Sequence, residues 1–187
     1  KEGLLSCLAN NSFESVTVTS LCKASGITRS TFYLHYSNIM EIVDDLVDDA
    51  IAYSKPGMVD NNNLQTIANT LSAASNSVSL REAYDSIFDR LPLCQRIIRH
   101  KKYLPLFLDE QISEYVLQRI IGREKDRQGL VIAESLGVLF DVGVSVFVFL
   151  VHGLYAVNKQ YKWSQSDEWL EAQKIIFELV YRGLQSR

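Results

Sequence analysis

Apolar residues recur every three or four positions along most of this chain, which is the spacing of one face of an α-helix. The clearest example lies between residues 39 and 51, where an apolar face opposes a face of acidic residues. Asn38 and Glu41 have the spacing of a capping box at the start of that helix. Because no segment shows the alternation of a strand apart from one ambiguous apolar run, the pattern predicts an all-α fold.

Helical periodicity continues through the second half of the chain. It predicts helices over residues 64–74, 79–100, 104–123, 130–158 and 167–185, with Pro92 kinking or dividing the second of them. Residues 55–63, KPGMVDNNN, interrupt the pattern with Pro, Gly and Asn. We therefore expect two domains, a three-helix head over residues 1–53 and an antiparallel helical bundle over residues 54–187.

Residues 130–158 form the most apolar stretch of the chain. A membrane-spanning helix needs about 20 apolar residues without charges, whereas Glu134, Asp141 and His152 interrupt this stretch, so it predicts a buried helix of a soluble protein. At about 100° per residue these three residues and Ser145 share one narrow face. That face is either the exposed edge of a core helix, which we favour, or the polar side of a small-molecule pocket.

Residues 17–36 predict two short helices joined by a glycine turn. Thr17 and Thr28 are suitable N-caps for the two helices, and Gly26 can adopt the positive φ that ends the first one. Apolar residues of both helices, Phe32 among them, would close a small core. This arrangement is a helix-turn-helix, and together with a preceding helix near Leu4 it makes the three-helix head.

The second of these helices carries side chains suited to the major groove of DNA. Arg29 stands in its first turn, where a guanidinium can donate two hydrogen bonds to guanine O6 and N7. Other polar side chains are better suited to phosphates, which fix register without reading sequence; they are Thr31, Tyr33, His35 and Tyr36. An ordinary helical hairpin is the alternative, but the spacing, the caps and the polar cluster coincide and favour DNA binding.

Residues 16–38, VTVTSLCKASGITRSTFYLHYSN, resemble the DNA-binding helix-turn-helix of the tetracycline-repressor (TetR) family of bacterial transcriptional regulators. The run TRSTFYLHY is the specific part of this match. The resemblance implies that DNA is contacted by Thr17, Thr19, Thr28, Arg29, Ser30, Thr31, Tyr33, His35 and Tyr36. Two positions depart from the family's pattern, since Ile39 stands where members often have Lys, and Leu34 where many have Arg or Tyr.

The charge distribution leaves a second hypothesis open. Residues 1–36 carry three cations against two acids, a net charge of +1, and the whole chain is at −3, although phosphate neutralisation supplies most non-specific DNA affinity. The fourth helix adds five acids: Glu41, Asp44, Asp45, Asp48 and Asp49. The alternative is therefore a co-regulator that binds DNA weakly and acts through a protein partner docked on this acidic fourth helix.

The resemblance also implies a mode of action, that of a ligand-responsive homodimeric repressor on a palindromic operator in double-stranded DNA. Members pair their last two helices across a two-fold axis, and residues 149–161 resemble a segment of the branch with dihydroxyacetone-kinase-activator regulators. An unidentified small-molecule effector would bind among the body helices. Its candidate contacts are aromatic or polar residues on predicted inward faces: Tyr84, Phe88, Tyr103, Phe107, Tyr115, Phe147 and His152.

The sequence has no pattern typical of catalysis, metal binding or a cofactor. Its three histidines lack paired-ligand spacing, its three cysteines lack zinc spacing, and its nine glycines form no phosphate-binding loop. An odd, unpatterned set of cysteines indicates reduced thiols. We expect a cytoplasmic protein that is no enzyme and has no metal, cofactor or membrane contact; because it opens on Lys1 within an apolar pattern, we also expect a preceding segment.

Overall fold

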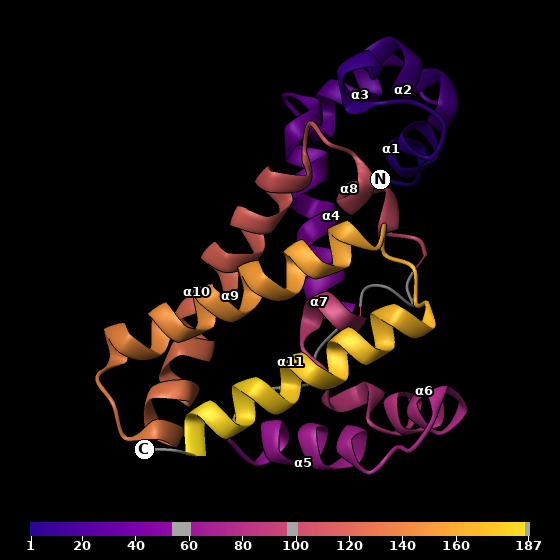
Figure 1. Cartoon of the computed structure of the whole chain (residues 1–187). Helices are drawn as coiled ribbons and strands as arrows, with labels where there is room; N and C mark the ends of the chain where they lie inside the picture. The colour runs from indigo at the N-terminus through magenta and orange to yellow at the C-terminus, as the bar shows by residue number, and fades with distance from the viewer. Residues whose placement is uncertain (54–60, 97–100, 186–187) are drawn as a thin grey trace. The chain divides into compact units, whose positions relative to one another are not determined.

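Helices make up all the regular secondary structure of the part of the chain that this computed structural model describes, residues 1–53, 61–96 and 101–185 (Figure 1). The predicted all-α fold is thereby confirmed. In chain order the elements are α1 (Glu2–Leu8), η1 (Phe13–Ser15), α2 (Val18–Ser25), α3 (Arg29–His35), α4 (Ile39–Tyr53), α5 (Asn61–Ser72), α6 (Ser77–Ser86), η2 (Phe88–Arg90), α7 (Leu93–Arg96), α8 (Leu104–Leu108), α9 (Ser113–Leu136), α10 (Phe140–Gln160) and α11 (Asp167–Gln185), where η denotes a 3₁₀ turn.

The chain divides into two compact units. Unit 1 comprises Lys1–Ser54 and Arg99–Gly122, and unit 2 comprises Lys55–Ile98 and Arg123–Arg187. The sequence assigned residues 99–122 to the body, whereas their contacts assign them to unit 1. Helix α9 therefore contributes its first ten residues to unit 1 and the rest to unit 2.

Unit 1 has an apolar core to which α1, α2, α3, α4, α8 and the start of α9 all contribute. Helix α1 packs on α2 and α8, and α2 packs on α3. Helix α4 buries the apolar stripe that its sequence predicts, with Ile42, Val43 and Leu46 at most 2% exposed. This core fixes the position of the helix-turn-helix formed by α2 and α3.

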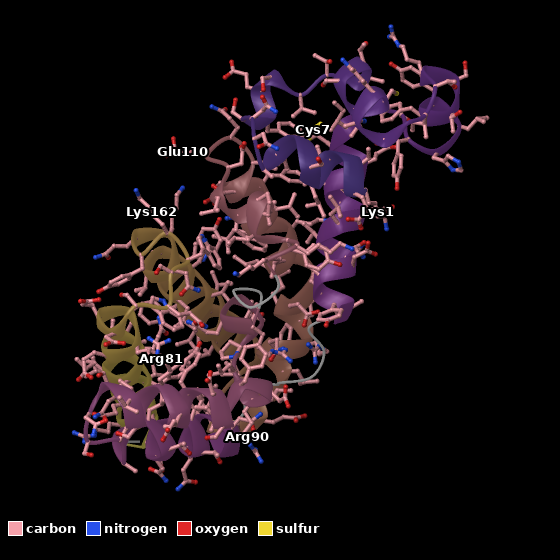
Figure 2. All side chains as sticks on the ribbon, turned by 90° about the vertical axis from the view of Figure 1, so that its right-hand side faces the viewer. Lys1, Cys7, Arg81, Arg90, Glu110 and Lys162 are labelled. Carbon is pink, nitrogen blue, oxygen red and sulfur yellow. The ribbon has the colours of Figure 1, made fainter. Side chains whose placement is uncertain are left out.

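In unit 2, helix α11 packs on α5 and α6. Its Trp169 is fully buried, and the ring meets that of Tyr84 edge-on at a centroid distance of 5.2 Å. The indole N–H donates a hydrogen bond to Asn158 of α10 (3.0 Å). At the surface of the unit, the Arg81 side chain of α6, which Figure 2 labels, forms an ion pair with Asp167 at the start of α11 (2.9 Å).

A pair of glycines lets α9 and α10 approach closely within unit 2. A Cβ on Gly143 of α10 would overlap the carbonyl oxygen of Gly129 on α9 and would lie 2.8 Å from the backbone nitrogen of Ala133. A Cβ on Gly129 would in turn lie 3.0 Å from the backbone of Val144. The two helices can pack at this distance only without side chains at these positions.

Two of the predicted helices are wrong because local signals override the periodicity. Residues 104–123 divide at Asp109, whose carboxylate accepts the N–H groups of Gln111 (2.9 Å) and Ile112 (3.2 Å). Residues 130–158 divide at Gly137, which ends α9 with φ +64°, and the next N–H donates to the carbonyl of Ala133 (3.0 Å).

The predicted helix over residues 79–100 is also divided, into α6, η2 and α7. Helix α6 starts at Ser77 because the Asn76 side chain caps it, accepting the N–H of Ser79 (2.9 Å). Pro92 precedes α7, in accordance with the predicted division. Residues 97–100 of the predicted helix lie outside the described ones.

Among the described residues, α10 alone has the length and apolar composition of a membrane-spanning helix, with a mean hydropathy of 1.9 in its most apolar 18 residues. One such helix is weak evidence for a membrane protein. Asp141, Ser145 and His152 are exposed on α10, and Glu134 is exposed on α9. The predicted stripe is therefore wrong in part, because the break at Gly137 separates Glu134 from the other three residues, and α10 exposes apolar residues such as Phe149 as well, so it is not a core helix with one polar edge.

Candidate nucleic-acid interface

The helix-turn-helix has the caps that the sequence predicts. The Thr17 side chain accepts the N–H of Ser20 (3.1 Å), and the Ser20 hydroxyl accepts the N–H of Thr17 (2.9 Å), which completes a capping box at the start of α2. Gly26 ends α2 in the left-handed conformation, with φ +65°. Thr28 then caps α3 by accepting the N–H of Thr31 (3.1 Å).

Apolar packing fixes the orientation of α3. Phe32 is 2% exposed, and Leu21 and Cys22 of α2 are buried beside it in the core of unit 1. The ring of Tyr33 meets the Phe32 ring edge-on at a centroid distance of 5.1 Å. Because Phe32 anchors one side of this short helix, its opposite side faces solvent.

Most of the side chains for which the resemblance implies DNA contact lie on the surface. Arg29 is exposed, and it makes no ion pair with any described residue. Thr31 is half-buried beneath the Thr28 hydroxyl, at an oxygen–oxygen distance of 2.9 Å. The exposed members of the set are Thr17, Thr19, Thr28, Arg29, Ser30, Tyr33 and His35.

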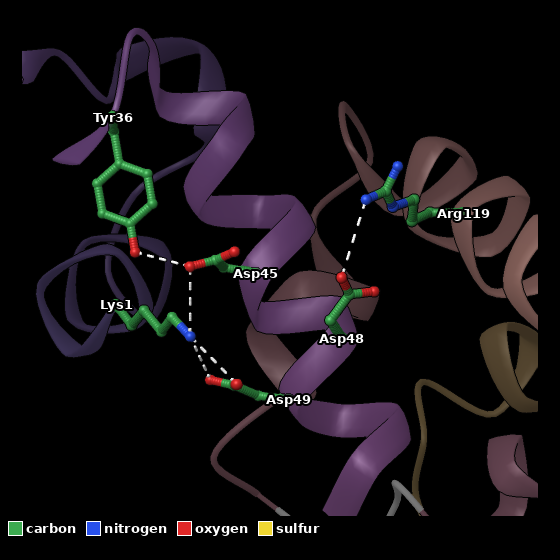
Figure 3. A network of polar contacts seen from close by, with 6 residues as sticks. All are labelled: Lys1, Tyr36, Asp45, Asp48, Asp49 and Arg119. Atoms are coloured by element: carbon green, nitrogen blue, oxygen red, sulfur yellow. Dashed lines mark hydrogen bonds and ion pairs between the residues drawn. The ribbon is translucent and has the colours of Figure 1, made fainter.

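Tyr36, at the end of α3, differs from the rest of the set. It is half-buried, and its hydroxyl donates a hydrogen bond to the Asp45 carboxylate of α4 (2.9 Å; Figure 3). Burial and this hydrogen bond raise the pKa of Tyr36, while the same bond, reinforced by Lys1, lowers the pKa of Asp45. Tyr36 therefore joins the end of α3 to α4, a role that the sequence did not predict.

A cation from α1's N-terminal end neutralises two acids of α4. The Lys1 ammonium lies 2.9 Å from Asp49 and 3.4 Å from Asp45 (Figure 3). The hydrogen bond to Asp49 raises the pKa of Lys1. Lys1, Asp45, Asp49 and Tyr36 thus form one polar cluster beside the helix-turn-helix.

The other acids of α4 also have partners within unit 1. Asp44 accepts a hydrogen bond from the Tyr115 hydroxyl of α9 (2.6 Å), which raises the pKa of Tyr115. The Arg119 guanidinium lies 3.4 Å from Asp44 and 3.9 Å from Asp48. Glu41 accepts the N–H of Ser37 (2.7 Å) at the start of the helix. All five carboxylates that define the acidic fourth helix are therefore engaged within the chain.

Sequence reasoning missed Lys1, Tyr115 and Arg119 as partners of the acidic helix. The acids repeat at intervals of three and four residues, and because like charges at this spacing oppose each other, they favour either solvent or a basic partner beside them. The spacing of the acids does not identify their partners, because these partners come from segments as distant in sequence as residue 119.

The seven candidate effector contacts belong to both units. Tyr103, Phe107 and Tyr115 lie in unit 1, and Tyr84, Phe88, Phe147 and His152 lie in unit 2. Tyr103, Phe107, Tyr84 and Phe147 are buried, as their predicted inward faces require.

Two of the seven are not on inward faces. Tyr115 is 40% exposed because it turns toward Asp44, and His152 is exposed with Nδ1 2.9 Å from the carbonyl of Val148. The buried Tyr84 hydroxyl donates to Gln95 (3.2 Å), whose amide donates to Gln173 (2.8 Å), so this part of unit 2 has a polar core.

Unit 1 contains an open cleft of about 610 Å³ between α1 and α8, which includes none of the seven candidates. Its lining mixes apolar residues such as Leu8, Leu104 and Leu108 with Lys101 and Glu110. Among the described residues, no three His, Cys, Asp or Glu side chains are grouped as a metal site would require.

Comparison with known proteins adds no identification. No protein-family model, no curated protein and no solved structure matches this chain.

Proposed function

We propose that this protein is a DNA-binding transcriptional regulator of the TetR type, acting as a ligand-responsive homodimeric repressor on a palindromic operator. The observation that supports it most directly is the capped, core-anchored helix α3, whose exposed side carries Arg29, Ser30 and Tyr33. Arg29 would donate to a guanine edge, and the hydroxyl-bearing side chains around it would contact phosphates.

A homodimer would supply the second recognition helix that an operator requires. Helices α10 and α11 expose large apolar side chains, among them Phe149 (73%), Leu179 (66%) and Ile175 (49%). Such surfaces mark association sites. Two heads spaced about 34–36 Å apart would then occupy successive major grooves.

The effector would act by binding one of two arrangements of the dimer more tightly than the other. The arrangement that it favours would separate the two α3 helices by a distance that no longer matches the half-sites. The buried polar and aromatic residues Tyr84 and Phe147 are its candidate contacts in unit 2.

The partner-docking alternative receives no support from the acidic helix. It was based on the low net charge and on the five acids of α4, and Lys1, Tyr115 and Arg119 engage carboxylates of α4 within unit 1. We therefore do not propose it as a second function.

The test is fluorescence anisotropy with the full chain and operator-like DNA selected from a random duplex pool, at two salt concentrations. Arg29→Ala is expected to weaken specific binding by roughly 1–3 kcal/mol and to relax specificity at one position. Arg29→Lys is the matched variant, since it keeps the charge but loses the two-pronged donor geometry. Binding that selects no sequence and ignores both variants would refute the proposal.

A further inference from the structure

Leu34 is the most exposed large apolar side chain among the described residues, at 80%. It lies in α3, where every other residue is polar or aromatic: Arg29, Ser30, Thr31, Phe32, Tyr33 and His35. A single exposed leucine on a protein surface is ordinary. Whether Leu34 has a function therefore depends on its position on the helix.

Helix geometry puts Leu34 at the centre of the outward side of α3. It follows the buried anchor Phe32 by two positions, which at about 100° per residue places it nearly opposite that anchor. It follows Ser30 by four positions, so the two share one face. Any groove that receives the polar side chains of α3 must receive Leu34 with them.

The chemistry of the major groove restricts what an apolar side chain can face there. Most base edges present hydrogen-bond donors and acceptors, and the thymine C5 methyl group is the apolar feature. A leucine placed over guanine, cytosine or the adenine amino group would remove those polar atoms from water without bonding them, which is unfavourable. Over thymine the same side chain buries a methyl group instead.

We infer that Leu34 reads a thymine methyl group, so that each operator half-site has an A·T pair facing the centre of α3. The inference rests on the proposed function and deepens it, because it assigns sequence reading to an apolar residue in addition to Arg29. The residue that departs from the family's usual Arg or Tyr becomes a specificity determinant of this protein.

The experiment removes the methyl group from the DNA and the side chain from the protein, separately and together. Thymines of the selected half-site are replaced one at a time by deoxyuridine, which keeps base pairing and lacks only the methyl group. Affinities are measured for the wild-type full chain, for Leu34→Ala and for the control Val78→Ala. Val78 is 68% exposed on α6 of unit 2, so it matches Leu34 in exposure outside the helix-turn-helix.

One thymine is expected to be sensitive. Its replacement should weaken wild-type binding about fourfold, the effect of losing one buried methyl-sized group. Leu34→Ala should bind the thymine-containing site about as weakly as the wild type binds the deoxyuridine-containing site. Its affinity should change less than about twofold on the same replacement. Val78→Ala should behave as the wild type at every position.

Three other outcomes overturn the inference. If no single replacement weakens wild-type binding, or if Leu34→Ala keeps the full sensitivity, Leu34 reads no methyl group while the proposed function stands. If the chain selects no DNA sequence and Arg29→Ala changes nothing, the proposed function and this inference fail together. Because Leu34 is exposed, loss of folding is not expected, and circular dichroism of each variant checks this.

Discussion

At the scale of single residues, the hydroxyl group of Tyr36 determines its structural role. Its ring packs near Phe32, at a centroid distance of 6.2 Å, and its hydroxyl donates to Asp45. Tyr36→Phe keeps the ring and removes this bond, so the free energy of unfolding should fall by about 1 kcal/mol in urea denaturation. Tyr33→Phe is the matched control, since Tyr33 is 52% exposed, and its stability should equal that of the wild type.

The same pair predicts how stability depends on pH. The hydrogen bond from Tyr36, with help from Lys1, holds the pKa of Asp45 below its ordinary value. The stabilisation is therefore fully present above the unfolded pKa of about 3.9 and is lost as the pH falls through the lower folded pKa.

Unfolding measured in urea from neutral pH down to about pH 3 should consequently show the wild type and Tyr36→Phe converging in acid. A difference between the two proteins that stayed constant over this range would contradict a role for the Asp45 titration. Tyr33→Phe should follow the wild-type curve throughout.

At the scale of helices, substituting two glycines of α10 distinguishes the effect of close helix packing from the effect of intrinsic helix propensity. Gly143→Ala would force a methyl group onto the Gly129 backbone, where no flexible side chain can give way. We expect a loss of roughly 1–3 kcal/mol or more in the free energy of unfolding. In Gly153→Ala, where nothing lies within 4 Å of the added Cβ, better helix propensity should stabilise the protein by up to about 1 kcal/mol.

Thermal and urea unfolding of the two variants check this contrast. Equal stabilities would mean that α9 and α10 do not pack at the distance described. Because both substitutions lie in the same helix, a general effect of alanine on α10 cannot produce opposite signs.

The helices also show what the sequence could predict. Signals that act within four residues were sufficient for the caps of Thr17 and Thr28, the turn at Gly26 and the apolar stripe of α4. The signals that end helices at Asp109 and Gly137 are equally local. The prediction missed them because it followed the apolar periodicity on both sides of each break. The pairing of Arg119 with Asp44 joins residues that only the folded chain brings together, so no local pattern could identify it.

At the scale of the whole molecule, the exposed apolar side chains of α10 and α11 predict association. Phe149→Asp or Leu179→Asp would place a charge on a surface that a partner copy must bury, and either should shift the protein to monomer in sedimentation equilibrium. Val78→Asp is the control, with a comparably exposed apolar residue on α6. A wild type that is monomeric at every concentration would refute the dimer.

The membership of residues 99–122 in unit 1 has a consequence for how the protein is made. Synthesis delivers α1 to α4 first, while the groups that engage their acids, Tyr115 and Arg119, emerge only after the intervening helices α5, α6 and α7. Asp44 and Asp48 of α4 therefore lack these partners until α9 has been synthesised. A nascent chain stopped before α8 would carry every predicted DNA contact and lack part of the scaffold that holds them.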